Sequence, residues 1–178
     1  MPTVTALRLP IEWETFGWDE SPVAGGIALH TGDPGWAWSP TAPAFAVPVL
    51  TSEPGEHLEH FTVDHVVLLV PDLDQAIGTL DRSGLTPRLR MKVSGRPAAF
   101  FRAGTVLEVI EAPVRDASLY GIALSTDLSL ETVAIEWKGR GLNLGDVKPA
   151  IQKGRRIMTV HGLDAGLAVM SADTSRSV

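Results

Sequence analysis

Hydrophobic residues in the middle of the chain follow two different spacings in turn. Residues 63–70, "VDHVVLLV", place apolar side chains on both faces of an extended chain, which predicts a strand with both faces covered. Leu73, Ile77 and Leu80 recur at helical spacing instead. The turn "PDLD" offers carboxylates for the free N–H groups of a first helical turn, and "SGL" supplies a glycine that favours a helix end. The pattern predicts a strand, a turn and a helix in succession.

The same succession is predicted a second time. Residues 64–113 open with "DHVVLLVPDLDQAIGTLDRSGL", and residues 119–173 open with "LYGIALSTDLSLETVAIEWKGRGL". The second halves, residues 95–113 and 155–173, align without a gap, and each predicts a hairpin after one further strand. Each copy therefore follows the order β-α-β-β-β. The period is longer than that of solenoid repeats, which favours two paired modules.

Two βαβββ modules, the first opened by "DHVVLLVPDLDQAI" and closed by "TVLEVIEAP", resemble the vicinal-oxygen-chelate superfamily. This group includes glyoxalase I, methylmalonyl-CoA epimerase, extradiol dioxygenases and the fosfomycin and bleomycin resistance proteins. The resemblance covers residues 61–173. It implies an α+β fold whose mixed sheets form a cupped, barrel-like cavity. We expect a glyoxalase-like domain over residues 61–178, with module one at 61–113 and module two at 117–173.

Residues 1–60 do not match the module and form a Trp- and Pro-rich arm. They hold four of the five Trp residues, and "GGIALHTGDPGWAW" predicts a hairpin that turns at "TGDPG". The stretch "SPTAPAFAVPVLTSEPGEH" carries four prolines and is expected to run extended. Two interpretations stay open. The arm packs on the modules or on a partner subunit, or it closes over the cavity as a lid.

One His and one Glu interrupt the apolar strand faces of module one. His65 shares a face with valines and leucines, and Glu108 does the same in "TVLEVIEA". Burying a lone carboxylate is costly unless it is paired, hydrogen-bonded or bound to a metal. The resemblance implies that both positions are metal ligands. An imidazole with a carboxylate suits a single divalent ion such as Zn, Mn, Fe or Ni.

Module two lacks the matching donors. In the alignment Tyr120 matches His65 and Ala168 matches Glu108, and an alanine cannot bind a metal. The metal-dependent members of the superfamily use three or four protein ligands. Either the metal site is completed from elsewhere in the chain, or His65 and Glu108 form a hydrogen-bonded pair in a metal-free pocket.

Further histidines are candidates for completing such a site. His161 matches Phe101 in the repeat and is expected on a neighbouring strand, where both residues are candidates for lining the cavity. His57 and His60 precede the first strand and are expected near the cavity mouth, in a loop that fits no rigid ligand geometry.

Basic residues alternate along the second strand of module one. Arg88, Arg90 and Lys92 share one face, opposite Leu89 and Met91. They form either a cationic wall that attracts a carboxylate or phosphate, or a solvated strand face.

Composition narrows the class of function. The formal net charge is −6 and the sequence contains no long Lys/Arg run, which argues against a nucleic-acid partner. No Cys is present, which excludes disulfides and thiolate ligands. The chain starts without a signal-peptide pattern and has no apolar run long enough for a membrane span, so we expect a cytoplasmic protein with no membrane partner.

The leading hypothesis is a glyoxalase/bleomycin-resistance-like protein that binds a small oxygen-rich molecule in the cavity, with the metal site reduced or lost. An alternative is a divalent-metal-dependent lyase, isomerase or dioxygenase that uses His65 and Glu108 as ligands. A third is a degenerate, non-catalytic partner-binding subunit. A homodimer is compatible with each of the three hypotheses.

Overall fold

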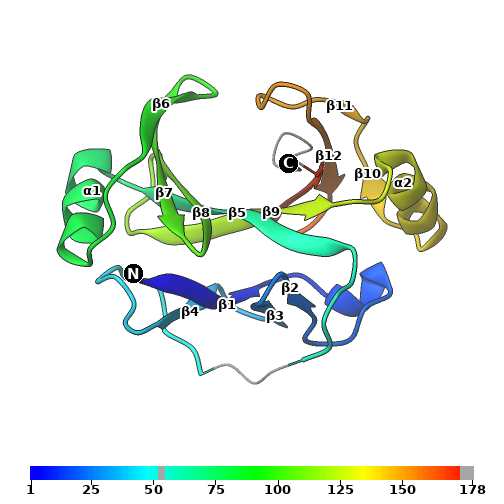
Figure 1. Ribbon diagram of the computed structural model, residues 1–178, viewed down its shortest axis with the longest axis horizontal. Helices are drawn as coiled ribbons and strands as arrows, with labels where there is room; N and C mark the ends of the chain where they lie inside the picture. The colour runs from blue at the N-terminus through cyan, green and yellow to red at the C-terminus, as the bar shows by residue number, and fades with distance from the viewer. Residues whose placement is uncertain (52–54, 173–178) are drawn as a thin grey trace.

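The structure is a computed structural model that describes residues 1–51 and 55–172. Within these ranges it contains two β-sheets and two α-helices (Figure 1). The larger sheet is strongly curved, and we call its concave side the trough. This architecture confirms the α+β prediction. Residues 173–178, where the predicted second module and its domain end, lie outside the described residues.

Module one folds as its sequence pattern predicts. The side chain of Asp72 accepts a hydrogen bond from the Gln75 N–H at 2.8 Å and begins the helix, and Gly84 follows the helix end with a φ of 81°. The elements are β5 (Phe61–Val70), α1 (Leu73–Arg82), β6 (Leu89–Val93), β7 (Arg96–Ala103) and β8 (Thr105–Glu111).

Module two repeats this order with a weaker second strand. Ser129 caps its helix by accepting a hydrogen bond from the Thr132 N–H at 3.1 Å. The single strand predicted between the second helix and its hairpin is replaced by two short segments that both pair with β12. The elements are β9 (Ser118–Thr126), α2 (Leu130–Gly139), β10 (Asn143–Leu144), β11 (Lys148–Pro149), β12 (Arg156–His161) and β13 (Gly166–Ser171).

The two modules join into one sheet through their first strands. The strand order is β10-β12-β13-β9-β5-β8-β7-β6, with β11 beside β12. β5 and β9 run antiparallel at the centre, and each is parallel to the last strand of its own module. The helices flank the outside of the trough, and its mouth lies between β6 and the β11 segment (Figure 1).

The N-terminal arm forms a separate four-stranded sheet in the order β2-β3-β1-β4. The predicted hairpin is wrong, because β1 lies between the two strands and pairs parallel with β3 and antiparallel with β4. The elements are β1 (Thr3–Leu9), the 3₁₀ helix η1 (Trp13–Phe16), β2 (Val23–Ala24), β3 (Ile27–Thr31) and β4 (Gly35–Ser39).

This small sheet covers the convex side of β5 and β9, away from the mouth of the trough (Figure 1). One apolar core runs through both sheets and includes Val66 and Leu107 from the module strands. Aromatic rings join the layers, with Phe16 4.8 Å from Trp137 of α2 and Trp18 5.0 Å from Phe61, between ring centroids. The arm therefore packs on the modules, and the lid interpretation is wrong.

Neither α1 nor α2, nor any other helical segment within the described ranges, has the length and apolar character needed to cross a membrane.

Candidate functional site

The strand register decides which side chains face the trough, because residues directly opposite each other in a sheet point to the same side. Val66, Leu107 and Phe101 belong to the convex core, so their strand neighbours His65, Glu108 and Phe100 face the trough.

Three rows of paired residues cross the trough. The His65 row contains Arg102, Val106, His65, Ala123, Ala168 and Thr159. The Glu108 row contains Leu89, Phe100, Glu108, Val67, Gly121 and Gly166. The Leu69 row contains Met91, Ala98, Ile110, Leu69 and Ser118.

A β-bulge brings Asp64 to the same side as His65. The pairing of β5 with β9 passes from Val63 directly to His65, so Asp64 is the extra residue. The Thr105 hydroxyl lies 2.8 Å from the carbonyl oxygens of both Val63 and Asp64 and holds the irregular backbone. A regular strand would send Asp64 into the convex core, where a carboxylate is costly.

Four charged or titratable side chains form a continuous contact series on the floor of the trough, which we call the buried network. Arg155 Nη2 lies 2.7 Å from Asp64 Oδ1, Asp64 Oδ2 lies 2.9 Å from His65 Nδ1, and His65 Nε2 lies 3.4 Å from Glu108 Oε2. Arg155 is 9% exposed, and its Nε also donates to the Ser171 carbonyl at 2.8 Å. Each charge therefore has a partner that offsets its loss of hydration.

The network sets the protonation of its members. Burial alone would raise the pKa of Asp64, but hydrogen bonds from His65 and Arg155, together with the charge of Arg155, lower it to about 2. An ionised Asp64 can only accept, so His65 Nδ1 carries a proton and donates it. Burial raises the pKa of Glu108, and nearby His65 offsets part of the rise. The pair that faces the trough can therefore both donate and accept hydrogen bonds.

The sequence alignment of module two is wrong by one residue at the first strand. Val67 pairs with Glu108 on one side and with Gly121 on the other. The two modules are arranged with two-fold symmetry about β5 and β9, so the counterpart of His65 in module two is Gly121 and not Tyr120. Tyr120 is the extra residue of the bulge in β9 and thus matches Asp64. The counterpart of Glu108 is Ala168, as the sequence predicts.

These positions do not fit the metal site that the resemblance implies. Gly121 has no room for any side chain, because a Cβ there would lie 1.9 Å from the carbonyl oxygen of Gly166. Ala168 offers no donor atom. Within residues 1–51 and 55–172, no three His, Cys, Asp or Glu side chains form a group able to hold a metal ion. Only His65 and Glu108 remain as donors, whereas zinc sites use three or four protein ligands.

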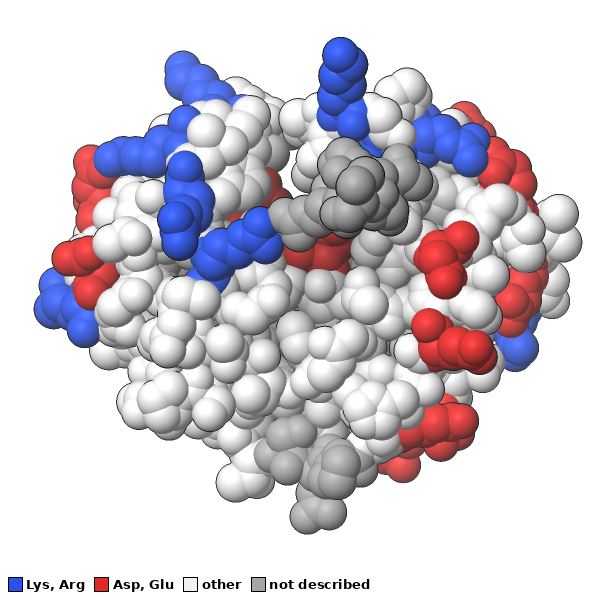
Figure 2. All heavy atoms as spheres, viewed as in Figure 1, with Lys and Arg blue, Asp and Glu red and all other residues white. Residues whose placement is uncertain are grey.

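The basic residues of β6 do not face the trough. Arg90 pairs with the convex residue Ala99 and forms a 2.7 Å ion pair with Asp74 of α1. Lys92 pairs with Pro97 and shares that side, whereas Arg88 precedes the strand. Arg90 and Lys92 therefore belong to a solvated outer face and do not form a cationic wall in the trough. Figure 2 shows Lys and Arg side chains gathered over the β6 and β7 side of the molecule.

The structure also corrects the predicted orientation of Phe101 and the predicted repeat counterpart of His161. Phe101 is buried in the convex core and cannot line the cavity; its neighbour Phe100 faces the trough instead. His161 matches Arg102 rather than Phe101, because the β12–β13 turn is one residue longer than the β7–β8 turn.

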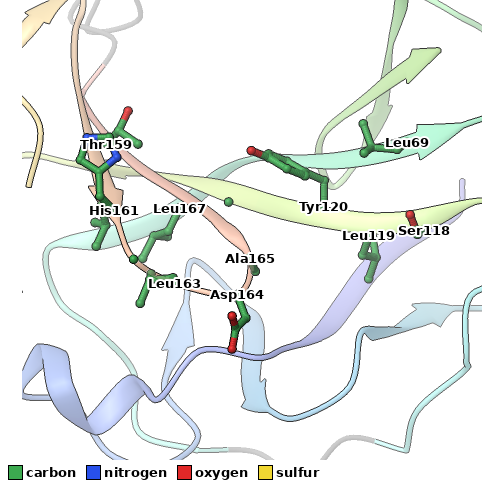
Figure 3. A pocket seen from close by; sticks show the side chains of 13 residues that line it. Leu69, Ser118, Leu119, Tyr120, Thr159, His161, Leu163, Asp164, Ala165 and Leu167 are labelled. Atoms are coloured by element: carbon green, nitrogen blue, oxygen red, sulfur yellow. The ribbon is translucent and has the colours of Figure 1, made fainter. Parts of the chain in front are cut away.

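Tyr120 and His161 do come together, at a hollow of about 400 Å³ on the module-two side of the trough. The Tyr120 ring extends from β9 toward the β12 side, where Thr159 and His161 lie (Figure 3). Leu69 lines the same hollow and lies two residues along the trough face of β5 from Val67. The hollow thus adjoins the Glu108 row without containing His65 or Glu108.

The N-terminal histidines are not at this site. His60 Nδ1 lies 2.9 Å from Asp127 Oδ1 in an exposed position, and His57 forms an isolated bridge with Val23 of the small sheet. A three-histidine site of His57, His60 and His65 is therefore excluded.

Sequence reasoning missed Asp64 and Arg155. Asp64 stands out as a second polar residue inside the apolar run "VDHVVLLV", and this is a usable signal. Arg155 follows the turn glycine Gly154 and looks like any surface arginine, so only the folded structure reveals its contact.

No protein-family model and no curated protein matches the sequence. Solved structures do match in fold. Methylmalonyl-CoA epimerase from Mycobacterium tuberculosis superposes with a TM-score of 0.53 at 16% identity, over 64% of this chain and 89% of that chain. The vicinal-oxygen-chelate fold is confirmed. A Streptomyces coelicolor methylmalonyl-CoA epimerase variant gives 0.52 at 16% identity, over 65% and 97% of the two chains. A hypothetical protein from Bacillus halodurans gives 0.52 at 16% identity, over 64% and 95%. At these identities the vicinal-oxygen-chelate likeness describes the fold alone.

Proposed function

We propose that the protein binds a small, oxygen-rich molecule in the trough, with Glu108 and His65 as its polar contacts and without a resident metal. The observation that carries the proposal is the buried network. It holds two hydrogen-bonding side chains on a face that is otherwise mostly apolar, which is the usual composition of a small-molecule site.

The network prepares Glu108 and His65 for neutral oxygens. Asp64 and Arg155 largely cancel each other's charge. The part of the buried network that faces the trough is the His65–Glu108 pair. A carboxyl whose pKa is raised by burial can donate to a carbonyl or hydroxyl, and its second oxygen can accept. Such a site suits alcohols, ketones and diols better than strongly anionic ligands.

One fold neighbour carries a bound ligand. The Streptomyces coelicolor epimerase variant was solved in complex with 2-nitronate-propionyl-CoA. The proposal for this protein takes from that structure only that a protein of this fold binds a ligand.

Ligand-observed NMR with small neutral diols and hydroxyketones tests the proposal. We expect saturation transfer to a diol such as ethane-1,2-diol in the wild type and a marked loss in Glu108→Gln and His65→Ala. The matched control is Glu136→Gln, an exposed acid on α2. Equal binding by all four proteins would exclude the trough as the site.

One observation favours a metal-dependent lyase, isomerase or dioxygenase as a second candidate. Asp64 engages His65 Nδ1 and leaves Nε2 directed at Glu108, which is how carboxylates orient metal-binding histidines. Elemental analysis after incubation with Mn, Fe, Ni and Zn separates the candidates. Stoichiometric metal that is lost in both His65→Ala and Glu108→Ala would favour the enzyme and overturn the metal-free proposal.

A cytoplasmic location and a homodimer stay predictions from the sequence. Neither is needed for the proposed site, because the trough and the buried network are built within one chain.

A further inference from the structure

The trough is apolar along β6 and β7 and polar at Glu108 and His65, and this difference restricts the chemical class of the ligand. We propose that the ligand is an amphiphile, with an aromatic or branched-alkyl body against β6 and β7 and one or two neutral oxygens at Glu108 and His65. The inference rests on the proposed function and adds the chemical class of the ligand.

The β6 wall of the trough is apolar and exposed. The register pairs Leu89 with Phe100 and Met91 with Ala98, so all four side chains face the trough. Leu89 is 52% exposed and Met91 is 38% exposed. We call Leu89, Met91, Phe100 and Ile110 the apolar wall.

The charges of β6 are confined to the opposite side of the same strand. Arg90 lies between Leu89 and Met91 in sequence, yet it points to the convex side and contacts Asp74. An edge strand is normally protected by charged side chains, and here only the outer face carries them. The exposed apolar surface is thus directed into the concave side, where a small molecule reaches it.

The apolar wall runs without a break to the polar contacts and the hollow. In the Glu108 row, Leu89 and Phe100 directly precede Glu108. In the Leu69 row, Met91, Ala98 and Ile110 lead to Leu69, which lines the hollow of about 400 Å³.

The volume of the hollow fits a small molecule rather than a protein segment. Tyr120 also lines the hollow, is 54% exposed and adds an aromatic surface.

The acids on the floor favour a ligand whose oxygens are uncharged. A carboxylate or phosphate placed at Glu108 would lie near the ionised Asp64, and Arg155 is already engaged by Asp64 and by the Ser171 carbonyl. Arg102 also faces the trough, but it is exposed to solvent and stands two strands away from His65 in the His65 row. A hydroxyl or carbonyl avoids the repulsion by Asp64. The expected class is therefore an aryl or alkyl alcohol, ketone or diol.

Two matched probes test the inference by isothermal titration and ligand-observed NMR. Ethane-1,2-diol and 1-phenylethane-1,2-diol carry the same pair of hydroxyl groups, and only the second has an apolar body. We expect the phenyl compound to bind the wild type about tenfold or more tightly, because part of the ring is removed from water against the apolar wall.

A variant pair on one strand locates the effect. Leu89→Ser combined with Met91→Ser should abolish the tenfold advantage of the phenyl compound and leave ethane-1,2-diol binding unchanged. Arg90→Ser, between them and on the opposite face, should leave both affinities unchanged. All three side chains are exposed, and circular dichroism melts of both variants would confirm that the fold is kept.

The outcomes separate this inference from the proposed function. If both diols bind and Glu108→Gln weakens both, but the β6 double variant changes neither, the inference fails and the proposed function stands. If neither diol binds, both fail. If the double variant dissociates a dimer in sedimentation analysis without changing the affinity ratio, the apolar wall is an interface between copies of the chain and the inference is overturned.

Discussion

The contact between Asp64 and Arg155 leads to a quantitative prediction about stability and pH. In Asp64→Asn the side chain keeps its shape but loses its charge, so Arg155 stays buried without an ionic partner. The amide also meets His65 Nδ1, which lies 2.9 Å from the carboxylate in the wild type and would then face a weaker acceptor or a second donor. We expect the variant to fold and to be less stable.

The magnitude follows from the lowered pKa. A folded-state pKa of about 2, against an ordinary value of 3.8, corresponds to about 2 kcal/mol of stability at pH 7. Because the folded pKa is depressed, this stability is present above the unfolded pKa and is lost as the pH falls toward the folded pKa. At pH 3 about half of it remains. This figure already includes the contact with Arg155, because the hydrogen bond and the charge of Arg155 are among the causes of the lowered pKa.

Urea unfolding of the wild type and Asp64→Asn at pH 7, 5, 4 and 3 measures the effect. We expect the difference in unfolding free energy to be about 2 kcal/mol at pH 7 and to shrink by about 1 kcal/mol by pH 3. Asp74→Asn removes an exposed acid that also contacts an arginine, and should change stability by less than about 1 kcal/mol at every pH. A difference for Asp64→Asn that stays constant from pH 7 to pH 3 would refute the reasoning.

Three further predictions concern other parts of the fold. Gly121→Ala should lower the unfolding free energy by about 2 kcal/mol or more, because its Cβ would meet the Gly166 backbone, whereas Gly139→Ala on α2 has open space and should change it little; chemical denaturation compares the two. Glu108→Gln should raise the melting temperature more at pH 8 than at pH 5, because a carboxyl with a raised folded pKa costs stability as it ionises with rising pH; an equal effect at both pH values would contradict this. Trp137→Ala should cost about 3–5 kcal/mol in urea unfolding, because its ring packs among the aromatic side chains that join the two sheets, and a loss below about 1 kcal/mol would mean that this packing contributes little.

The sequence predicts the modules well because their signals are local. The N-cap Asp72 and the glycines after both helices act within a few residues, and the alternation of apolar residues in β5 survives in the structure. These features need no knowledge of distant contacts.

The remaining features depend on pairings between distant segments. β1 inserts between β3 and β4, and no pattern within "GGIALHTGDPGWAW" reveals a strand that comes from the first residues of the chain. The bulges at Asp64 and Tyr120 occupy equivalent positions, so the wrong match of Tyr120 to His65 comes from the turn before each helix. An alignment of Asp72 with Asp127 is out of register there, because Ser129 and not Asp127 caps the second helix. The contact of Arg155 with Asp64 spans most of both modules.

The ion pair that orients His65 also distinguishes one module from the other. Asp64 lies in module one and Arg155 in module two, so each half of the chain carries one member of a single buried contact. If the chain were cut between the modules, the second fragment would lose the acid that pairs with Arg155. In a pair of two second fragments, Arg155 would lie opposite Tyr120, the counterpart of Asp64, which carries no carboxylate. The residues that hold an imidazole in place thus also favour assembly of the second half with the first half over assembly with its own copy.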